Sequence, residues 1–188
     1  MPIKRRPTKK TSKKNKEEEE DLLFRKDDVI YFYCEINRSF LIKFNQILCE
    51  MNEDDSVEEI TLRISSSGGE VSYAFSIASL IENSEKPIHG IVDSECSSAA
   101  LFLLLACKTR KATRCSEFLM HEGSCEEDLK TTELLKRYNA EMVMEKETKD
   151  YILSKTKIVS ELYDKINADG ISFYTEDAMR YGIITKVI

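Results

Sequence analysis

The sequence predicts an α/β fold, in which a parallel sheet built from repeated β-α units is flanked by helices. Short β-type runs alternate with segments of helical periodicity along most of the 188 residues. In residues 59–83, a strand-like run leads through two adjacent glycines directly into a helical segment. Residues 99–107 (AALFLLLAC) are the longest apolar run, which is typical of a buried helix. This alternating order implies parallel strands joined by right-handed crossovers.

Two β-α units are expected in the first half of the chain. Residues 27–36 (DDVIYFYCEI) are rich in β-branched and aromatic side chains and predict a strand. Residues 38–53 predict a helix, because apolar side chains recur at helical spacing, namely Leu41, Phe44, Ile47 and Leu48. Residues 59–65 alternate as a strand does, and residues 70–83 then predict a second helix.

A third unit follows, and two short strands come after it. Residues 87–93 (PIHGIVD) predict a strand entered through a proline, and residues 97–107 predict a buried helix. Residues 111–115 and 117–122 predict short strands, the second of which ends at His121.

The last third of the chain is mostly helical in pattern. Asp128 to Lys157 combine many charges with apolar residues at intervals, which predicts one long amphipathic helix. Residues 159–167 predict another helix, and residues 175–182 predict a short helix that ends at a glycine. Residues 183–188 (IITKVI) predict a closing strand.

Charge divides the chain into a tail and a single domain. Residues 1–16 carry eight Lys or Arg and no acid, and EEEED follows. The sequence therefore predicts a disordered basic and acidic tail over residues 1–26 and one domain over residues 27–188. Residues 17–188 hold 20 basic and 34 acidic side chains, a net of −14, so a nucleic-acid surface is not expected outside the basic tail.

The cysteines and the hydropathy indicate a cytoplasmic protein. The six cysteines are scattered without a CxxC pair, which predicts reduced thiols, mostly buried, and no metal site. The longest apolar run is too short to cross a membrane, and the basic N-terminus lacks the apolar core of a secretory signal.

Three groups that can carry chemistry fall where expected strands end, which is where parallel α/β sheets place their sites. Gly68 and Gly69 follow one strand, Ser97 and Ser98 follow the next, and His121 ends a third. A serine at this position is typical either of an ordinary helix N-cap or of a nucleophile that uses a nearby histidine as base. The only other histidine, His89, lies early in its strand, where a core or edge role is expected.

Four segments resemble the proteolytic subunits of the Clp proteases, serine peptidases related to the crotonase-like folds. ITLRISSSGGEVSYAFSIASLI resembles their strand, glycine turn and helix, and DSECSSAALFLLLAC resembles their nucleophile segment. RKATRCSEFLMHEG resembles their strand that ends in Met-Ile-His, and TEDAMRYGIITKVI resembles their closing segment. The resemblance covers residues 28–188 in order and implies their fold, with a long handle helix from Asp128 to Lys157.

The resemblance also implies a site. Ser98 falls on the nucleophile of the family and His121 on its base, whereas Ser97 takes the place of a small residue. The backbone N–H groups of Gly69 and Ala99 fall on the oxyanion hole. The third catalytic residue corresponds best to Asp169, although this residue is about one position out of register and could instead serve a turn.

Several positions depart from the family pattern. Asp164 on the preceding helix is a weaker substitute for Asp169. A glycine of the family is Ser94 here, its turn proline is Ser67, and its aspartate near the C-terminus is Thr185. These departures leave open a member that has lost activity.

The function implied by the resemblance is that of an ATP-dependent serine endopeptidase without a cofactor, which hydrolyses unfolded proteins inside a homo-oligomeric chamber of heptameric rings. An AAA+ unfoldase ATPase is the implied partner, although the charged N-terminus does not resemble the axial loop of the family. A first alternative is a catalytically inactive ring subunit or peptide-binding scaffold. A second is a crotonase-like acyl-CoA enzyme, for which Arg63 is the only basic residue near the glycine turn.

Overall fold

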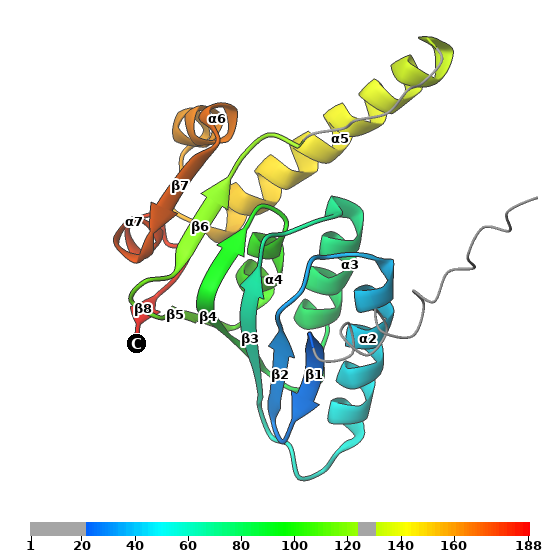
Figure 1. The fold of residues 1–188 in the computed structure, drawn as a ribbon, viewed down its shortest axis with the longest axis vertical. Coiled ribbons are helices and arrows are strands. Elements are labelled where there is room, and N and C mark those ends of the chain that lie inside the picture. Colours follow the sequence, from blue (N-terminus) through cyan, green and yellow to red (C-terminus); the bar gives the residue numbers. More distant parts are fainter. Residues whose placement is uncertain (1–21, 124–130) are drawn as a thin grey trace, which may run out of the picture.

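The structure, a computed structural model, describes residues 22–123 and 131–188. Its strands form one mixed sheet with the order β1-β2-β3-β4-β5-β8, from which β6 branches by pairing with β4, and β7 pairs with β6 (Figure 1). The strands are β1 (Leu23–Lys26), β2 (Val29–Phe32), β3 (Ile60–Ser66), β4 (Ile88–Ser97), β5 (Thr109–Ala112), β6 (Glu117–Met120), β7 (Ile171–Tyr174) and β8 (Lys186–Val187). The helices are α2 (Arg38–Glu53), α3 (Val71–Glu82), α4 (Ala100–Ala106), α5 (Thr131–Lys155), α6 (Ser160–Asp169) and α7 (Thr175–Arg180).

The centre of the sheet is parallel, as the sequence predicts. β2 pairs with β3, β3 with β4 and β4 with β5, all in parallel, and each of the first three strands leads into a helix. The helix α2 coincides with its predicted range. Its N-terminus is capped by Asn37, whose side chain accepts a hydrogen bond from the N–H of Phe40 at 3.0 Å.

The sheet begins earlier than the sequence analysis places it. Leu23–Lys26 form β1, which pairs with β2 in an antiparallel hairpin, and the side chain of Leu23 is fully buried. The expected boundary between tail and domain, after residue 26, is therefore wrong for these residues. The apolar run around Leu23 is short and stands between charged segments, which hides its strand character in the sequence. The rest of the predicted tail, residues 1–21, lies outside the described residues.

The core lies between the sheet and the helices α2, α3 and α4, which cover one face of it (Figure 1). Ile60, Leu62 and Ile64 of β3 are fully buried, whereas the residues between them are half-buried on the opposite face. This alternation follows from the two-residue period of a strand. In α4 every residue from Ala100 to Leu105 is buried, which explains the long apolar run.

The long helix α5 leaves the sheet and projects away from it (Figure 1). Near its C-terminal end Tyr151 contacts the rings of Phe75 and Phe102, with ring centroids 5.7 and 5.8 Å away. Farther toward its N-terminus, Met142 and Val143 are exposed. The first residues of the predicted helix, 128–130, lie outside the described residues. Within the described chain, no helix has both the length and the hydropathy that a membrane crossing requires.

The structure places β4 and β7 differently from the expectation. β4 continues to Ser97, so α4 begins only at Ala100, and β7 forms an antiparallel pair with β6 that the sequence does not predict. The pairing with β3 shifts along β4, because β3 advances from Ile64 to Ser66 while β4 advances from Val92 to Cys96. This irregularity turns the end of β4 toward β6 and away from β5.

Candidate functional site

Ser98 occupies the sharp turn between β4 and α4. Its φ of 53° lies in the left-handed region, where non-glycine residues other than Asn and Asp are uncommon. Two hydrogen bonds hold the turn: the N–H of Ser98 donates to the carbonyl of Leu119 at 2.7 Å, and the carbonyl of Ser98 accepts from the N–H of Leu101 at 3.1 Å. Ser98 is half-buried. A strained backbone fixed from both sides is typical of a functional position.

The glycine turn lies directly against Ser98. A Cβ built on Gly68, whose φ is 99°, would lie 2.9 Å from the Cβ of Ser98 and 3.0 Å from the nitrogen of Ala99. A Cβ built on Gly69, whose φ is 136°, would instead lie 2.3 Å from the carbonyl oxygen of Ile36. Each glycine is therefore required both by its left-handed backbone and by a close approach of another segment.

Two backbone N–H groups beside this contact, those of Gly69 and Ala99, are the ones that the sequence analysis assigned to an oxyanion hole. Ile36 donates to the carbonyl of Gly68 at 2.6 Å, and Glu70 donates to the carbonyl of Ile36 at 3.0 Å. In this parallel bridge the N–H of Gly69 between them is turned away from Ile36. Among the described residues, the N–H groups of Gly69 and Ala99 have no hydrogen-bond partner.

His121 follows β6 on the strand next to Ser98. Ser97 and Leu119 are paired in the parallel register, so Ser98 lies opposite Met120 and His121 comes one residue later. The Nδ1 atom of His121 lies 2.7 Å from the carbonyl oxygen of Glu122. A carbonyl can only accept, so Nδ1 is the donor in this contact, and in the neutral form of an imidazole the other nitrogen, Nε2, is then the acceptor. Within the described chain, the Ser98 hydroxyl and the His121 ring are not hydrogen-bonded to each other.

Asp169 ends α6 and is exposed, and Gly170 follows with a φ of 61°. Gly170 lies beside His121, since a Cβ built on it would be 3.7 Å from the His121 Cβ. In the described part of the chain the Asp169 carboxylate makes no hydrogen bond or ion pair with His121. Asp164 forms an ion pair with Lys149 at 2.5 Å. The structure thus places Asp169 next to a residue that packs beside His121, but it does not join the two side chains.

Two other residues raised by the sequence, Ser94 and His89, have structural partners. The hydroxyl of Ser94 lies 2.6 Å from that of Ser65, and the backbone of Ser94 is not left-handed, so the missing family glycine causes no strain there. His89 lies in β4 with Nδ1 2.8 Å from the hydroxyl of Thr109, in agreement with the expected core or edge role.

Arg63 is engaged on the open face of the sheet. It forms a two-pronged ion pair with Asp93, which also accepts a hydrogen bond from the hydroxyl of Tyr33 at 2.5 Å. The hydrogen bond to Asp93 raises the pKa of the Arg63 guanidinium. Arg63 therefore has its charge partner within the fold, which removes the one feature that favoured an acyl-CoA site.

Sequence reasoning missed the roles of Gly68 and Ser66. Gly68 closes the contact with Ser98, and Ser66, the last residue of β3, accepts a hydrogen bond from the N–H of Gly68 at 3.2 Å. The signal for Ser66 is the alternation of β3, which assigns it to the buried face with Leu62 and Ile64.

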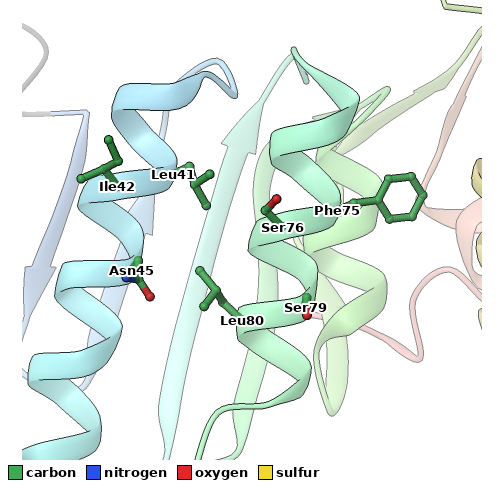
Figure 2. A pocket seen from close by; sticks show the side chains of 7 residues that line it. All are labelled: Leu41, Ile42, Asn45, Phe75, Ser76, Ser79 and Leu80. Atoms are coloured by element: carbon green, nitrogen blue, oxygen red, sulfur yellow. The ribbon is translucent and has the colours of Figure 1, made fainter. Parts of the chain in front are cut away.

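The described chain also holds a shallow groove between α2 and α3, shown in Figure 2. Leu41 of α2 and Leu80 of α3 extend toward each other across it. None of the candidate site residues lines this groove, and its walls carry no titratable side chain. Among the described residues, no group of three or more His, Cys, Asp or Glu side chains is arranged to hold a metal ion.

Comparisons with known proteins agree with the fold. A family model described as Clp protease matches residues 12–188. Among solved structures, a single-substitution mutant of ClpP1 from Listeria monocytogenes is similar, with a TM-score of 0.77 and 19% identity. The match covers 86% of this chain and 91% of that one. No curated protein matches the sequence at a significant level.

Proposed function

The chain belongs to the Clp protease family, and on this premise we propose that it is an active serine endopeptidase with Ser98 as its nucleophile. The observation that carries the proposal is the close contact of Gly68, the residue before Gly69, with the left-handed Ser98 and with the backbone nitrogen of Ala99. An ordinary N-cap serine requires neither the left-handed backbone nor a second segment packed against it.

In the proposed reaction, the Ser98 hydroxyl attacks a peptide carbonyl while Nε2 of His121 takes its proton. The N–H groups of Gly69 and Ala99 donate to the oxyanion of the tetrahedral intermediate. His121 then gives the proton to the leaving amine, and water releases the acyl group by the same route. The contact of Nδ1 with the Glu122 carbonyl supports this direction of transfer, because in a neutral ring whose Nδ1 donates, Nε2 is the acceptor.

Ser98 and His121 must approach each other for this reaction. They lie on neighbouring strands, and such strands are about 4.8 Å apart. Catalytic hydrogen bonds are often long in the free enzyme and shorten when substrate binds. We propose that the ring of His121 turns toward Ser98 on substrate binding and that Asp169, one residue from Gly170, orients it.

The substrates and partners are proposed from the family. Unfolded polypeptides are cleaved inside a chamber of stacked, heptameric, homo-oligomeric rings, and an AAA+ unfoldase ATPase supplies these polypeptides to the chamber.

A catalytically inactive ring subunit or peptide-binding scaffold is the second candidate. It is favoured by the missing hydrogen bond between Ser98 and His121 and by the unconnected Asp169 carboxylate, both within the described chain.

Labelling with a fluorophosphonate separates the two candidates. The assembled full chain should be labelled and should cleave denatured casein, and both signals should disappear in Ser98→Ala and fall at least about 10³-fold in His121→Ala. Ser97→Ala is the matched control, because this neighbouring serine should leave labelling intact. An unlabelled wild-type assembly would identify the scaffold.

A further inference from the structure

Ser66 joins the glycine turn to the segment after β2. Its side chain is 3% exposed, its hydroxyl donates to the carbonyl of Cys34 at 2.6 Å, and it accepts from the N–H of Gly68 at 3.2 Å. A serine hydroxyl has one proton to donate, and here that proton goes to the carbonyl of Cys34. One of its lone pairs accepts the N–H of Gly68. The buried carbonyl and the buried amide therefore both depend on this one side chain.

The turn is held on two sides. On one side, Ile36 donates to Gly68 and accepts from Glu70, so the turn is attached to the same segment that Ser66 contacts. On the other side, Gly68 touches Ser98 so closely that it leaves no room for a Cβ. A displacement of Gly68 therefore changes where the N–H of Gly69 lies relative to Ser98.

We propose that Ser66 is a positioning residue for the oxyanion hole, an inference that rests on the proposed role of Ser98 as nucleophile. Ser66 is buried and acts through Gly68, which sets the direction of the Gly69 N–H. Its two neighbours have no such role. The hydroxyl of Ser65 is bonded to Ser94 on the other face, and Ser67 is exposed without a hydrogen-bond partner among the described residues.

We expect that loss of the Ser66 hydroxyl lowers the turnover number, kcat. Loss of an oxyanion donor costs about 10²–10³ in kcat, and a displacement of about 1 Å costs about 10². Ser66→Ala should therefore lower kcat by about 10- to 100-fold. KM should stay within about twofold, because the oxyanion forms only in the transition state.

The test compares the assembled full chain with Ser66→Ala and the matched control Ser67→Ala. The readouts are kcat and KM on a fluorogenic peptide, the rate of fluorophosphonate labelling, and hydrogen exchange resolved to the amide of Gly68. In Ser66→Ala we expect slower turnover, slower labelling and exchange at Gly68 about tenfold faster. Ser67→Ala should match the wild type in all three.

Two outcomes overturn the inference in distinguishable ways. If the wild type is labelled and turns over, but Ser66→Ala equals Ser67→Ala, Ser66 does not position the site. If the wild type is never labelled, the proposed function fails and the positioning role of Ser66 fails with it. Should Ser66→Ala lose its cooperative unfolding, Ser66→Cys carries the test, since a thiol fills the space but is a weaker partner. The kcat of Ser66→Cys should lie between that of the wild type and the roughly 10- to 100-fold lower value expected for Ser66→Ala. A kcat equal to that of the wild type overturns the inference.

Discussion

The backbone N–H of Ser98 donates to the carbonyl of Leu119 at 2.7 Å and so ties the end of β4 to β6. This bond continues the parallel register of Ser97 with Leu119 past the end of the strand. It also holds Ser98 in its left-handed conformation, and Leu119 precedes His121 by only two residues. The relative position of the candidate nucleophile and base is therefore set by a single strand pairing.

Replacement of Gly69 by alanine should destabilise the domain strongly. The new Cβ would meet the Ile36 carbonyl oxygen at 2.3 Å with φ at 136°. Backbone strain and overpacking together should cost about 3 kcal/mol, a fall in Tm of about 10 °C. Gly123→Ala is the control for thermal unfolding, because a Cβ there has nothing within 4 Å. Equal melting temperatures for the two variants would contradict the described glycine turn.

Asp169→Asn should lower kcat by about 10- to 100-fold. Loss of the carboxylate in a catalytic triad costs about 10⁴ when it leaves the wrong histidine tautomer. Here the Glu122 carbonyl is a second acceptor within reach of Nδ1 of His121 and can keep the tautomer when the carboxylate is lost, so a smaller loss is expected. The measurement is steady-state kinetics, with Asp177→Asn on α7 as the control.

An unchanged kcat in Asp169→Asn would show that Asp169 does not orient His121. A larger loss in Asp164→Asn would transfer that role to Asp164. A loss near 10⁴ in Asp169→Asn would mean that the bond to Glu122 does not persist in the working enzyme.

Tyr163→Phe should leave the stability of the domain unchanged or raise it. It should also reduce the loss of stability at alkaline pH. The Tyr163 side chain is 2% exposed, and its hydroxyl is buried without a hydrogen-bond partner in the described structure. Burial raises the pKa of this phenol to about 12, with Glu145 and Asp164 adding to the effect. An unsatisfied buried hydroxyl costs about 1–3 kcal/mol, which phenylalanine avoids.

The sign of the pH effect follows from that pKa. An unfolded tyrosine loses its proton near pH 10, whereas the folded one keeps it until about pH 12, so stability is lost as the pH rises between these values. Urea unfolding at pH 8 and pH 11 should therefore show a smaller decrease for Tyr163→Phe than for the wild type. A variant less stable than the wild type at pH 8 would mean that the hydroxyl has a partner.

Thiol reagents should divide the five cysteines within residues 22–123 into two classes. Cys34, Cys96 and Cys107 are buried, and burial raises the pKa of Cys34 and of Cys107 to about 12 and also raises that of Cys96. These thiols should resist iodoacetamide at pH 8 until the chain is denatured, because only the thiolate reacts. Cys49 and Cys115 are exposed and should react in the folded protein.

Peptide mass spectrometry reads the modification at each cysteine. Rapid modification of Cys96 in the native protein would contradict the packing between β4 and its neighbours, since this side chain is fully buried. If Cys49 is modified only after the protein is denatured, an assembly of the chain covers α2.

The sequence by itself determined the local elements and the chemical groups of the candidate site. Periodicity alone gives α2 at its observed bounds, and the apolar run gives the buried helix α4, because these patterns depend on neighbours along the chain. The position of Ser98, His121 and the glycines at strand ends follows from the same patterns.

Only the tertiary structure decided how these groups meet. β1 and β7 are short strands whose pairing partners, not their own residues, make them strands. The shift of register along β4 brings Ser98 beside β6, and the close approach of Gly68 to Ser98 joins segments about thirty residues apart. Ser66 gains its importance through hydrogen bonds to Cys34 and Gly68, and no pattern of a single strand reports such contacts.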